Sequence, residues 1–89
     1  MKILCTTVFE EQLKSILETF SEKDFAATKS FKMYLDTVII NIPTKAQKYK
    51  KSIYFNDENI RDVEHQGFII PFLFDEKNDI YLILGIVEK

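Results

Sequence analysis

The spacing of apolar residues along the chain predicts helices in its first half and strands at both ends. Between residues 8 and 42 apolar side chains recur every three to four positions, the period of a helix with one buried side. Before residue 7 and after residue 59 they form short runs rich in β-branched and aromatic residues, as strands do. The predicted order is strand, helix, helix and then three strands.

The first helix is expected to begin near Val8. Thr7 and Glu10 have the spacing of a capping box, in which the Thr hydroxyl and the Glu carboxylate each accept from a backbone N–H that the helix leaves free. The predicted buried side consists of Phe9, Leu13, Ile16, Leu17 and Phe20. This pattern indicates an amphipathic helix that covers a core.

The second helix is expected from about Glu22, because Ser21 and Asp24 repeat the capping pattern. It should end near Asn41, since Pro43 lacks a backbone N–H and clashes with the preceding turn. Its predicted apolar side is Ala27, Phe31, Tyr34, Leu35, Val38, Ile39 and Ile42. A link this short makes the two helices an antiparallel hairpin.

Three antiparallel strands are predicted in the last third of the chain: Ile60 to His65, Phe68 to Phe74 and Ile80 to Val87. Their short connections, Gln66-Gly67 and Asp75 to Asp79, can only join antiparallel neighbours. A further strand from Met1 to Thr6 is expected to pair with one of them. Residues 44–59 have no clear pattern, apart from a short extended piece at residues 53–55.

These elements predict one α+β domain, residues 1–89, in two layers: a helical hairpin on one face of a four-stranded sheet. The strands Phe68 to Phe74 and Ile80 to Val87 are apolar on both faces, and the chain has too few helices to cover both. We therefore expect another chain to seal part of the sheet.

Composition and motifs indicate which classes of function are not expected for this chain. The chain has 89 residues, a net charge of −2 and a single cysteine, Cys5, which is expected to be a buried thiol. No run is long enough to span a bilayer, and no signal-peptide pattern is present, so a cytoplasmic location and no membrane role are expected. The sequence has no zinc or calcium motif and no Gly-rich phosphate loop, so neither a metal nor a cofactor is expected.

The basic connection between the second helix and the later strands is the first candidate site. Lys45, Lys48, Lys50 and Lys51 place positive charge beside the ring of Tyr49. Such a segment either holds a phosphate backbone or a carboxylate-rich partner, or is simply a solvated loop.

Arg61 and His65 are the other candidates, and each is the only residue of its type. In a strand they share one face with Val63. Arg61 is either a rigid fork for a carboxylate or phosphate, or one half of a local salt bridge. His65 is either an acid–base group or a surface histidine without a role.

The sequence resembles the RelE/ParE superfamily of type II toxin–antitoxin toxins. The resemblance rests on Asn59-Ile-Arg-Asp-Val63, Gly67-Phe-Ile-Ile-Pro-Phe72 and Ile83-Leu-Gly-Ile86, in an order and spacing that cover nearly the whole chain. It implies a growth-inhibiting toxin that a cognate antitoxin wraps and neutralises. Homo-oligomers or toxin–antitoxin hetero-oligomers are both compatible with it.

Within this superfamily, ParE-like members inhibit DNA gyrase and RelE-like members cut mRNA on the ribosome. The resemblance favours a ParE-like protein, because residues 68–74 contain no basic side chain and residues 87–89 contain no His or Tyr. Partner contacts are then expected at Arg61, Lys45, Lys48, Tyr49, Lys51 and Phe72. In the RelE-like alternative, Arg61, Lys50, Lys51 and His65 would carry the ribonuclease chemistry. A third reading is a degenerate, non-toxic member that only binds its partner.

Overall fold

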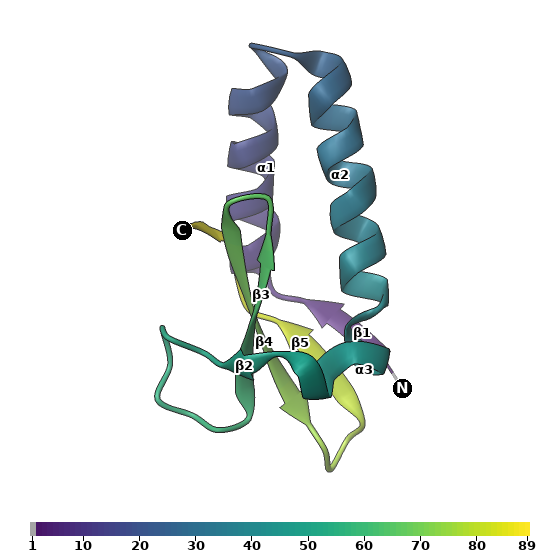
Figure 1. The fold of residues 1–89 in the computed structure, drawn as a ribbon, viewed down its shortest axis with the longest axis vertical. Helices are drawn as coiled ribbons and strands as arrows, with labels where there is room; N and C mark the ends of the chain where they lie inside the picture. Colours follow the sequence, from purple (N-terminus) through teal and green to yellow (C-terminus); the bar gives the residue numbers. More distant parts are fainter. Residues whose placement is uncertain (1) are drawn as a thin grey trace.

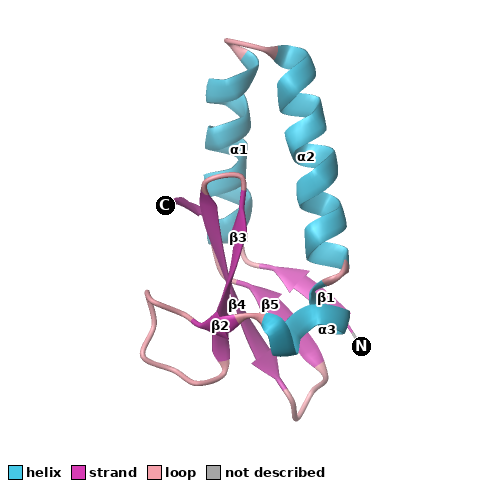
Figure 2. Cartoon of the chain, viewed as in Figure 1, coloured by secondary structure: helices cyan, strands magenta, loops and turns pink. Residues whose placement is uncertain are grey.

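The fold combines a helical hairpin with a largely antiparallel sheet. A computed structural model of the chain describes residues 2–89, shown in Figures 1 and 2. Its elements are β1 (Lys2–Cys5), α1 (Thr7–Ser21), α2 (Phe25–Ile40), α3 (Ile42–Lys45), the 3₁₀ helix η1 (Ala46–Lys48), β2 (Lys50–Lys51), β3 (Ile60–His65), β4 (Phe68–Asp75), β5 (Ile80–Ile83) and β6 (Val87–Glu88). The predicted α+β class and the order of its main elements are confirmed.

The strands form one sheet in the order β1-β5-β4-β3-β2, and β6 pairs with the beginning of β4. β1 lies parallel to β5, whereas the pairs β2–β3, β3–β4 and β4–β5 are antiparallel. The prediction that the first strand pairs with one of the last three is therefore confirmed. The short strands β2 and β6 enlarge the four-stranded sheet that the sequence indicated.

The predicted strand from Ile80 to Val87 is wrong in its second half. β5 ends at Ile83, the chain bends through residues 84–86, and β6 returns to pair with Phe68 and Ile69 of β4. α1 and the residue before it hold the bend: the Thr6 hydroxyl donates to the carbonyl of Leu84 at 3.0 Å, and Gln12 Oε1 accepts from the N–H of Ile86 at 2.9 Å. β5 thus ends where Thr6 and Gln12 form polar contacts with the next residues, although the apolar sequence would allow the strand to continue.

Both helix caps differ from the prediction. Thr6, not Thr7, caps α1, and its hydroxyl accepts from the N–H of Phe9 at 3.0 Å. Asp24, not Ser21, caps α2 by accepting from the N–H of Ala27 at 3.0 Å. The two capping residues have the extended backbone that a cap requires, whereas Ser21 is still helical.

α2 ends at Ile40 with Asn41 as its cap, which confirms the predicted end of this helix. The chain does not become irregular there, because Pro43 falls in the first turn of α3, where a missing N–H costs nothing. The extended piece expected at residues 53–55 is not a strand; it belongs to a loop, residues 52–59.

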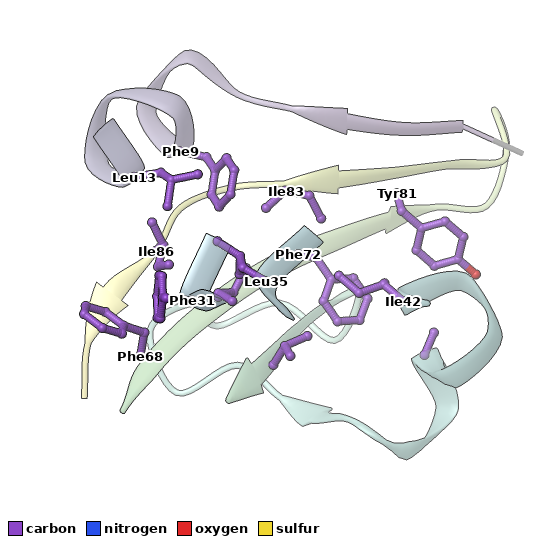
Figure 3. Close-up of a cluster of buried hydrophobic side chains, with 13 residues drawn as sticks. Phe9, Leu13, Phe31, Leu35, Ile42, Phe68, Phe72, Tyr81, Ile83 and Ile86 are labelled. Carbon is purple, nitrogen blue, oxygen red and sulfur yellow. The ribbon is translucent and has the colours of Figure 1, made fainter. Parts of the chain in front are cut away.

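The hydrophobic core lies between the helices and one face of the sheet (Figure 3). Phe9 and Leu13 of α1 and Phe31 and Leu35 of α2 pack on side chains of β3, β4 and β5. The sheet contributes Val63, Phe68, Ile70, Phe72, Tyr81 and Ile83. α3 and η1 complete the cover with Ile42 and Ala46, so this part of the connection belongs to the helical layer.

The opposite face of the sheet, which we call the far face, is also apolar. Strand register aligns Leu4, Leu82, Leu73 and Ile60 in one row across β1, β5, β4 and β3. The 52–59 loop covers part of this face, since Tyr54 and Phe55 line a hollow together with Pro71. The chain therefore supplies some of the cover that the sequence led us to expect from another chain.

No helix within residues 2–89 is both long enough and apolar enough to cross a membrane.

Candidate functional site

Arg61 lies on the helix-facing side of β3, and its guanidinium is occupied by the basic connection. Nη1 donates to the carbonyl oxygens of Tyr49 at 2.8 Å, Ala46 at 3.3 Å and Gln47 at 3.4 Å. Two of these carbonyls belong to η1 and the third to the residue after it, and that of Ala46 also accepts from the N–H of Tyr49 at 3.3 Å. Among the described residues Arg61 has no ion pair with a carboxylate, so neither predicted role describes its main contacts.

Strand register brings together several of the residues expected to bind a partner. Lys51, Arg61 and Phe72 are aligned across β2, β3 and β4. The Tyr49 ring meets the Phe72 ring edge-on, with centroids 5.8 Å apart. Phe72, however, has no exposed surface and lies in the core, so its side chain cannot contact a partner in this structure.

The lysines of the connection are all exposed, and we call them the lysine strip: Lys45, Lys48, Lys50 and Lys51. Within β2, Lys51 lies on the side of Arg61 and Lys50 on the opposite side of the strand. Within residues 2–89 none of them pairs with a carboxylate, and Lys51 alone has a polar side-chain contact, with Asn56 Oδ1 at 3.4 Å. The chain has a net charge of −2, and without these four lysines its net charge would be −6. The strip is thus a local positive surface on an acidic body.

Tyr49 lies beside the strip with its ring half-buried. Burial raises the pKa of its phenol, so the side chain is neutral at physiological pH. It can contribute an apolar edge and a hydroxyl to the lysine strip, and it adds no charge.

His65 is buried, contrary to the expectation of a surface histidine. The residue is 8% exposed, its ring lies 5.3 Å from that of Phe31, and its Nε2 is buried without a hydrogen-bond partner. Phe31 also contacts Phe20 and Phe68, so His65 is part of an aromatic cluster between the helices and the β3–β4 turn.

The structure places three residues of the ribonuclease alternative, Lys50, Lys51 and Arg61, next to one another, but not His65. Lys51 pairs with Arg61 at one end of β3, and His65 lies four residues further along that strand. At about 3.3 Å per residue this is a separation of roughly 13 Å. The arrangement places cations at one end of β3 and the buried imidazole at the other.

Cys5 is exposed rather than buried as predicted. Its thiol is nevertheless partly desolvated, and this desolvation, followed by the carboxylates of Glu10 and Asp36, raises its pKa. The thiol form therefore predominates at neutral pH, which is the opposite of an activated nucleophile. No group of residues suited to hold a metal ion occurs within residues 2–89.

The structure reveals a second surface that the sequence reasoning missed. Phe25, Met33 and Ile40 form an apolar stripe along α2 and are 67%, 57% and 68% exposed. Beside them two adjoining hollows of about 550 and 410 Å³ lie between α1 and α2, and both are lined by Leu17 and Thr28. The spacing of 25, 33 and 40 is itself helical, so a second apolar face on α2 could have been recognised.

Comparison with known proteins supplies the fold family. No family model and no curated protein matches the sequence. A chain from the solved structure of the chromosomal ParDE TA system from P. aeruginosa superimposes with a TM-score of 0.68 over 99% of this chain and 95% of that chain, at 17% identity. The RelE/ParE-like fold expected from the sequence is therefore confirmed.

Proposed function

We propose that this protein is the toxin of a type II toxin–antitoxin module, and that it is ParE-like in acting on a protein target such as DNA gyrase. The observation that carries the proposal is the likeness to a chain of a ParDE TA system over 99% of this chain. Two surfaces suited to partners support it: the lysine strip and the apolar stripe of α2.

The apolar stripe is the proposed site of the cognate antitoxin. Three large apolar side chains more than half exposed on one helix are unusual for a surface that stays in water. The adjoining hollows between α1 and α2 fit the apolar face of an amphipathic helix, a recurring mode of recognition for segments that fold on binding.

The lysine strip is the proposed contact with the cellular target. Its charges are free for a carboxylate-rich or phosphate-bearing surface, and Tyr49 lies among them. Arg61 does not belong to this surface but supports it. Its hydrogen bonds to the carbonyls of Ala46, Gln47 and Tyr49 fix the backbone that carries the lysines. We assign Arg61 a positioning role.

Binding is favoured over RNA cleavage by the placement of the possible catalytic groups. Attack by a ribose 2′-OH needs a base, an acid and cationic support for the phosphorane within reach of one phosphate. His65 is buried under Phe31, and strand spacing places it roughly 13 Å from Arg61. These features weigh against the RelE-like alternative, in which Arg61, Lys50, Lys51 and His65 would act together.

Two parallel assays test the target. The purified chain should inhibit supercoiling by DNA gyrase and leave mRNA intact in a translating extract. Replacing Lys45 and Lys48 by Glu should weaken the inhibition, whereas Lys77→Glu, in the exposed β4–β5 turn, should not. Cleavage of mRNA without an effect on gyrase would overturn the proposal in favour of the ribonuclease.

Expression in growing cells tests the toxin assignment itself. Induction of the chain alone should stop growth, and co-expression of the adjacent open reading frame should restore it. Normal growth during induction of the folded protein would instead identify a non-toxic member that only binds its partner.

A further inference from the structure

A small polar cavity lies beside the lysine strip, on the helix-facing side of the sheet. Its volume is about 70 Å³, and its walls come from η1, the end of the 52–59 loop and the strands β3, β4 and β5. The polar side chains in these walls are those of Gln47, Glu58, Asn59, Arg61 and Tyr81. Apart from Arg61, none of these side chains has a hydrogen bond or an ion pair within residues 2–89. Their polar atoms therefore remain available to a ligand.

Arg61 uses only one part of its guanidinium inside the fold. Nη1 donates to the three carbonyls of the connection, whereas Nε and Nη2 have no hydrogen-bond partner among the described residues. Nε and Nη2 form one edge of the planar group, and a carboxylate can accept two parallel hydrogen bonds from such an edge. Nη1 thus keeps its positioning role, while this edge is free to bind a ligand in the cavity that Arg61 lines.

Tyr81 adds a second donor at a fixed place. Its ring is stacked on that of Phe74, with centroids 4.6 Å apart, and is tilted against that of Phe72 at 6.2 Å. The residue is buried, and its hydroxyl has no hydrogen-bond partner within residues 2–89. In Figure 3 this hydroxyl points out of the group of core side chains. A phenol held in this way can donate to an acceptor in the cavity that Arg61 also lines.

The size and the charges of the cavity indicate which ligand fits. A volume of about 70 Å³ is little more than two water molecules occupy in the liquid, so a group of a few atoms fits and an aromatic ring does not. Arg61 is the one cation among the lining residues, and Glu58 adds a negative charge. A nucleic acid would bring several phosphates toward this carboxylate, whereas an acidic side chain brings a single charge. The cavity therefore suits one carboxylate.

We propose that this cavity binds the carboxylate of an acidic side chain on the cellular target, with Arg61 Nε and Nη2 and the Tyr81 hydroxyl as donors. Lys45 and Lys48 precede and follow the two wall residues of η1 in the chain, so they can meet further acidic residues of the same partner. The proposal rests on the proposed function only in taking that partner to be a protein. It identifies the group that aligns the lysine strip on the target.

Nuclear magnetic resonance on the isolated chain tests the site, because Arg61 is the only arginine and its Nε–H gives a single signal. The probes are acetate, a capped peptide of three glutamates and inorganic phosphate, each titrated at the same ionic strength. Acetate and the peptide should both shift the Arg61 Nε–H signal. The peptide should bind more tightly than acetate or phosphate, because the lysine strip adds contacts with its other carboxylates.

Variants of the cavity walls test the donors without disturbing Arg61. Tyr81→Phe removes the hydroxyl and keeps the ring, so the dissociation constant of the peptide should rise roughly tenfold, the loss of one hydrogen bond to a charged group. Tyr54→Phe makes the same change at a tyrosine that lines a different cavity and should leave the dissociation constant unaltered. Glu58→Gln removes the negative charge from the wall and should lower the dissociation constant several-fold.

Peptide binding that leaves the Arg61 Nε–H signal unmoved would overturn the proposal, since the carboxylates would then lie on the lysine strip alone. Equal effects of Tyr81→Phe and Tyr54→Phe, or no gain from Glu58→Gln, would do the same. Tighter binding of phosphate or acetate than of the peptide would exclude an acidic protein segment as the ligand. The titration needs no target protein, so it can fail while the chain still stops growth, and it can succeed with a chain that is not toxic.

Discussion

At the scale of single residues, Arg61 does what no other side chain of this protein can do. Its planar guanidinium meets three carbonyl oxygens of the connection between α3 and β2, at Ala46, Gln47 and Tyr49. All three contacts come from one nitrogen, Nη1, which a lysine ammonium on its shorter side chain would not place at the same point. Arg61→Ala and Arg61→Lys should therefore both lower the free energy of unfolding, by roughly 1 to 3 kcal/mol for Ala, the range for lost bonds to a charged group.

Urea unfolding measures that free energy, and gyrase inhibition separates the positioning role from a contact role. If Arg61 positions the lysine strip, Arg61→Lys should weaken inhibition much as Arg61→Ala does, because both misplace the lysines, whereas in a contact role the retained charge should preserve most of the inhibition. An Arg61→Lys variant with wild-type stability and activity would show that only the positive charge matters at this position.

Gly85 is a residue whose small size the packing requires. A methyl group at this position would lie 2.8 Å from Gln12 Oε1, the atom that accepts from the N–H of Ile86. Gly85→Ala should thus cost roughly 0.5 to 1.5 kcal/mol of stability, because the flexible Gln12 side chain must move away and give up its hydrogen bond from Ile86 N–H. The cost should shrink in a Gln12→Ala background, because that variant removes the clashing atom. Four urea titrations of the double-mutant cycle measure this coupling, and strict additivity would contradict it.

At the scale of elements, the cap of α2 allows a sharp comparison. Asp24→Ala removes the acceptor for the N–H of Ala27 and should destabilise the protein by about 1 kcal/mol. Ser21→Ala, at the position that the sequence suggested, should have a smaller effect, because the Ser21 hydroxyl only donates to the carbonyl of Glu18 inside α1. Thermal unfolding of both variants measures the difference, and a larger effect at Ser21 would refute this assignment.

The sequence predicts elements well where one local pattern determines them. The side of α1 that contains Phe9 and Leu13, the end of α2 before Pro43 and the strands β3 and β4 all follow from periodicity and turn residues. The caps differ by one and three positions because Thr7 follows Thr6 directly and Ser21 lies three residues before Asp24, and only backbone conformation distinguishes these candidates.

Features that depend on contacts between distant segments were not predictable in this way. β5 ends at Ile83 because Thr6 and Gln12 bond to the next residues, and neither partner is marked in the sequence of the strand. The burial of His65 depends on the position of Phe31 in α2. Nothing in the sequence around Arg61 indicates a hydrogen-bonded guanidinium. Its Nη1 nevertheless donates to carbonyls 12 to 15 residues earlier in the chain.

At the scale of the whole molecule, the partner surfaces lie on different elements. The apolar stripe runs along α2, and the lysine strip follows α3, η1 and β2. Because the apolar stripe and the lysine strip share no residue, each can be altered while the other is left intact.

Variants of the apolar stripe test whether the two surfaces can be altered independently. Replacing Phe25, Met33 and Ile40 by Gln keeps good helix formers on α2 and changes only side chains that are more than half exposed. The free energy of unfolding should therefore change by less than about 0.5 kcal/mol per site. Solubility of the isolated chain should rise, because three exposed apolar side chains are removed.

In cells the same variant should still stop growth but no longer be rescued by the antitoxin. The lysine-strip variant, with Lys45 and Lys48 changed to Glu, should behave in the opposite way: it should lose toxicity and still bind the antitoxin. Growth curves with and without the antitoxin, together with co-purification, measure both effects. If the stripe variant were neutralised as well as the wild type, the antitoxin would have to bind elsewhere, and the exposed apolar face of α2 would need another partner.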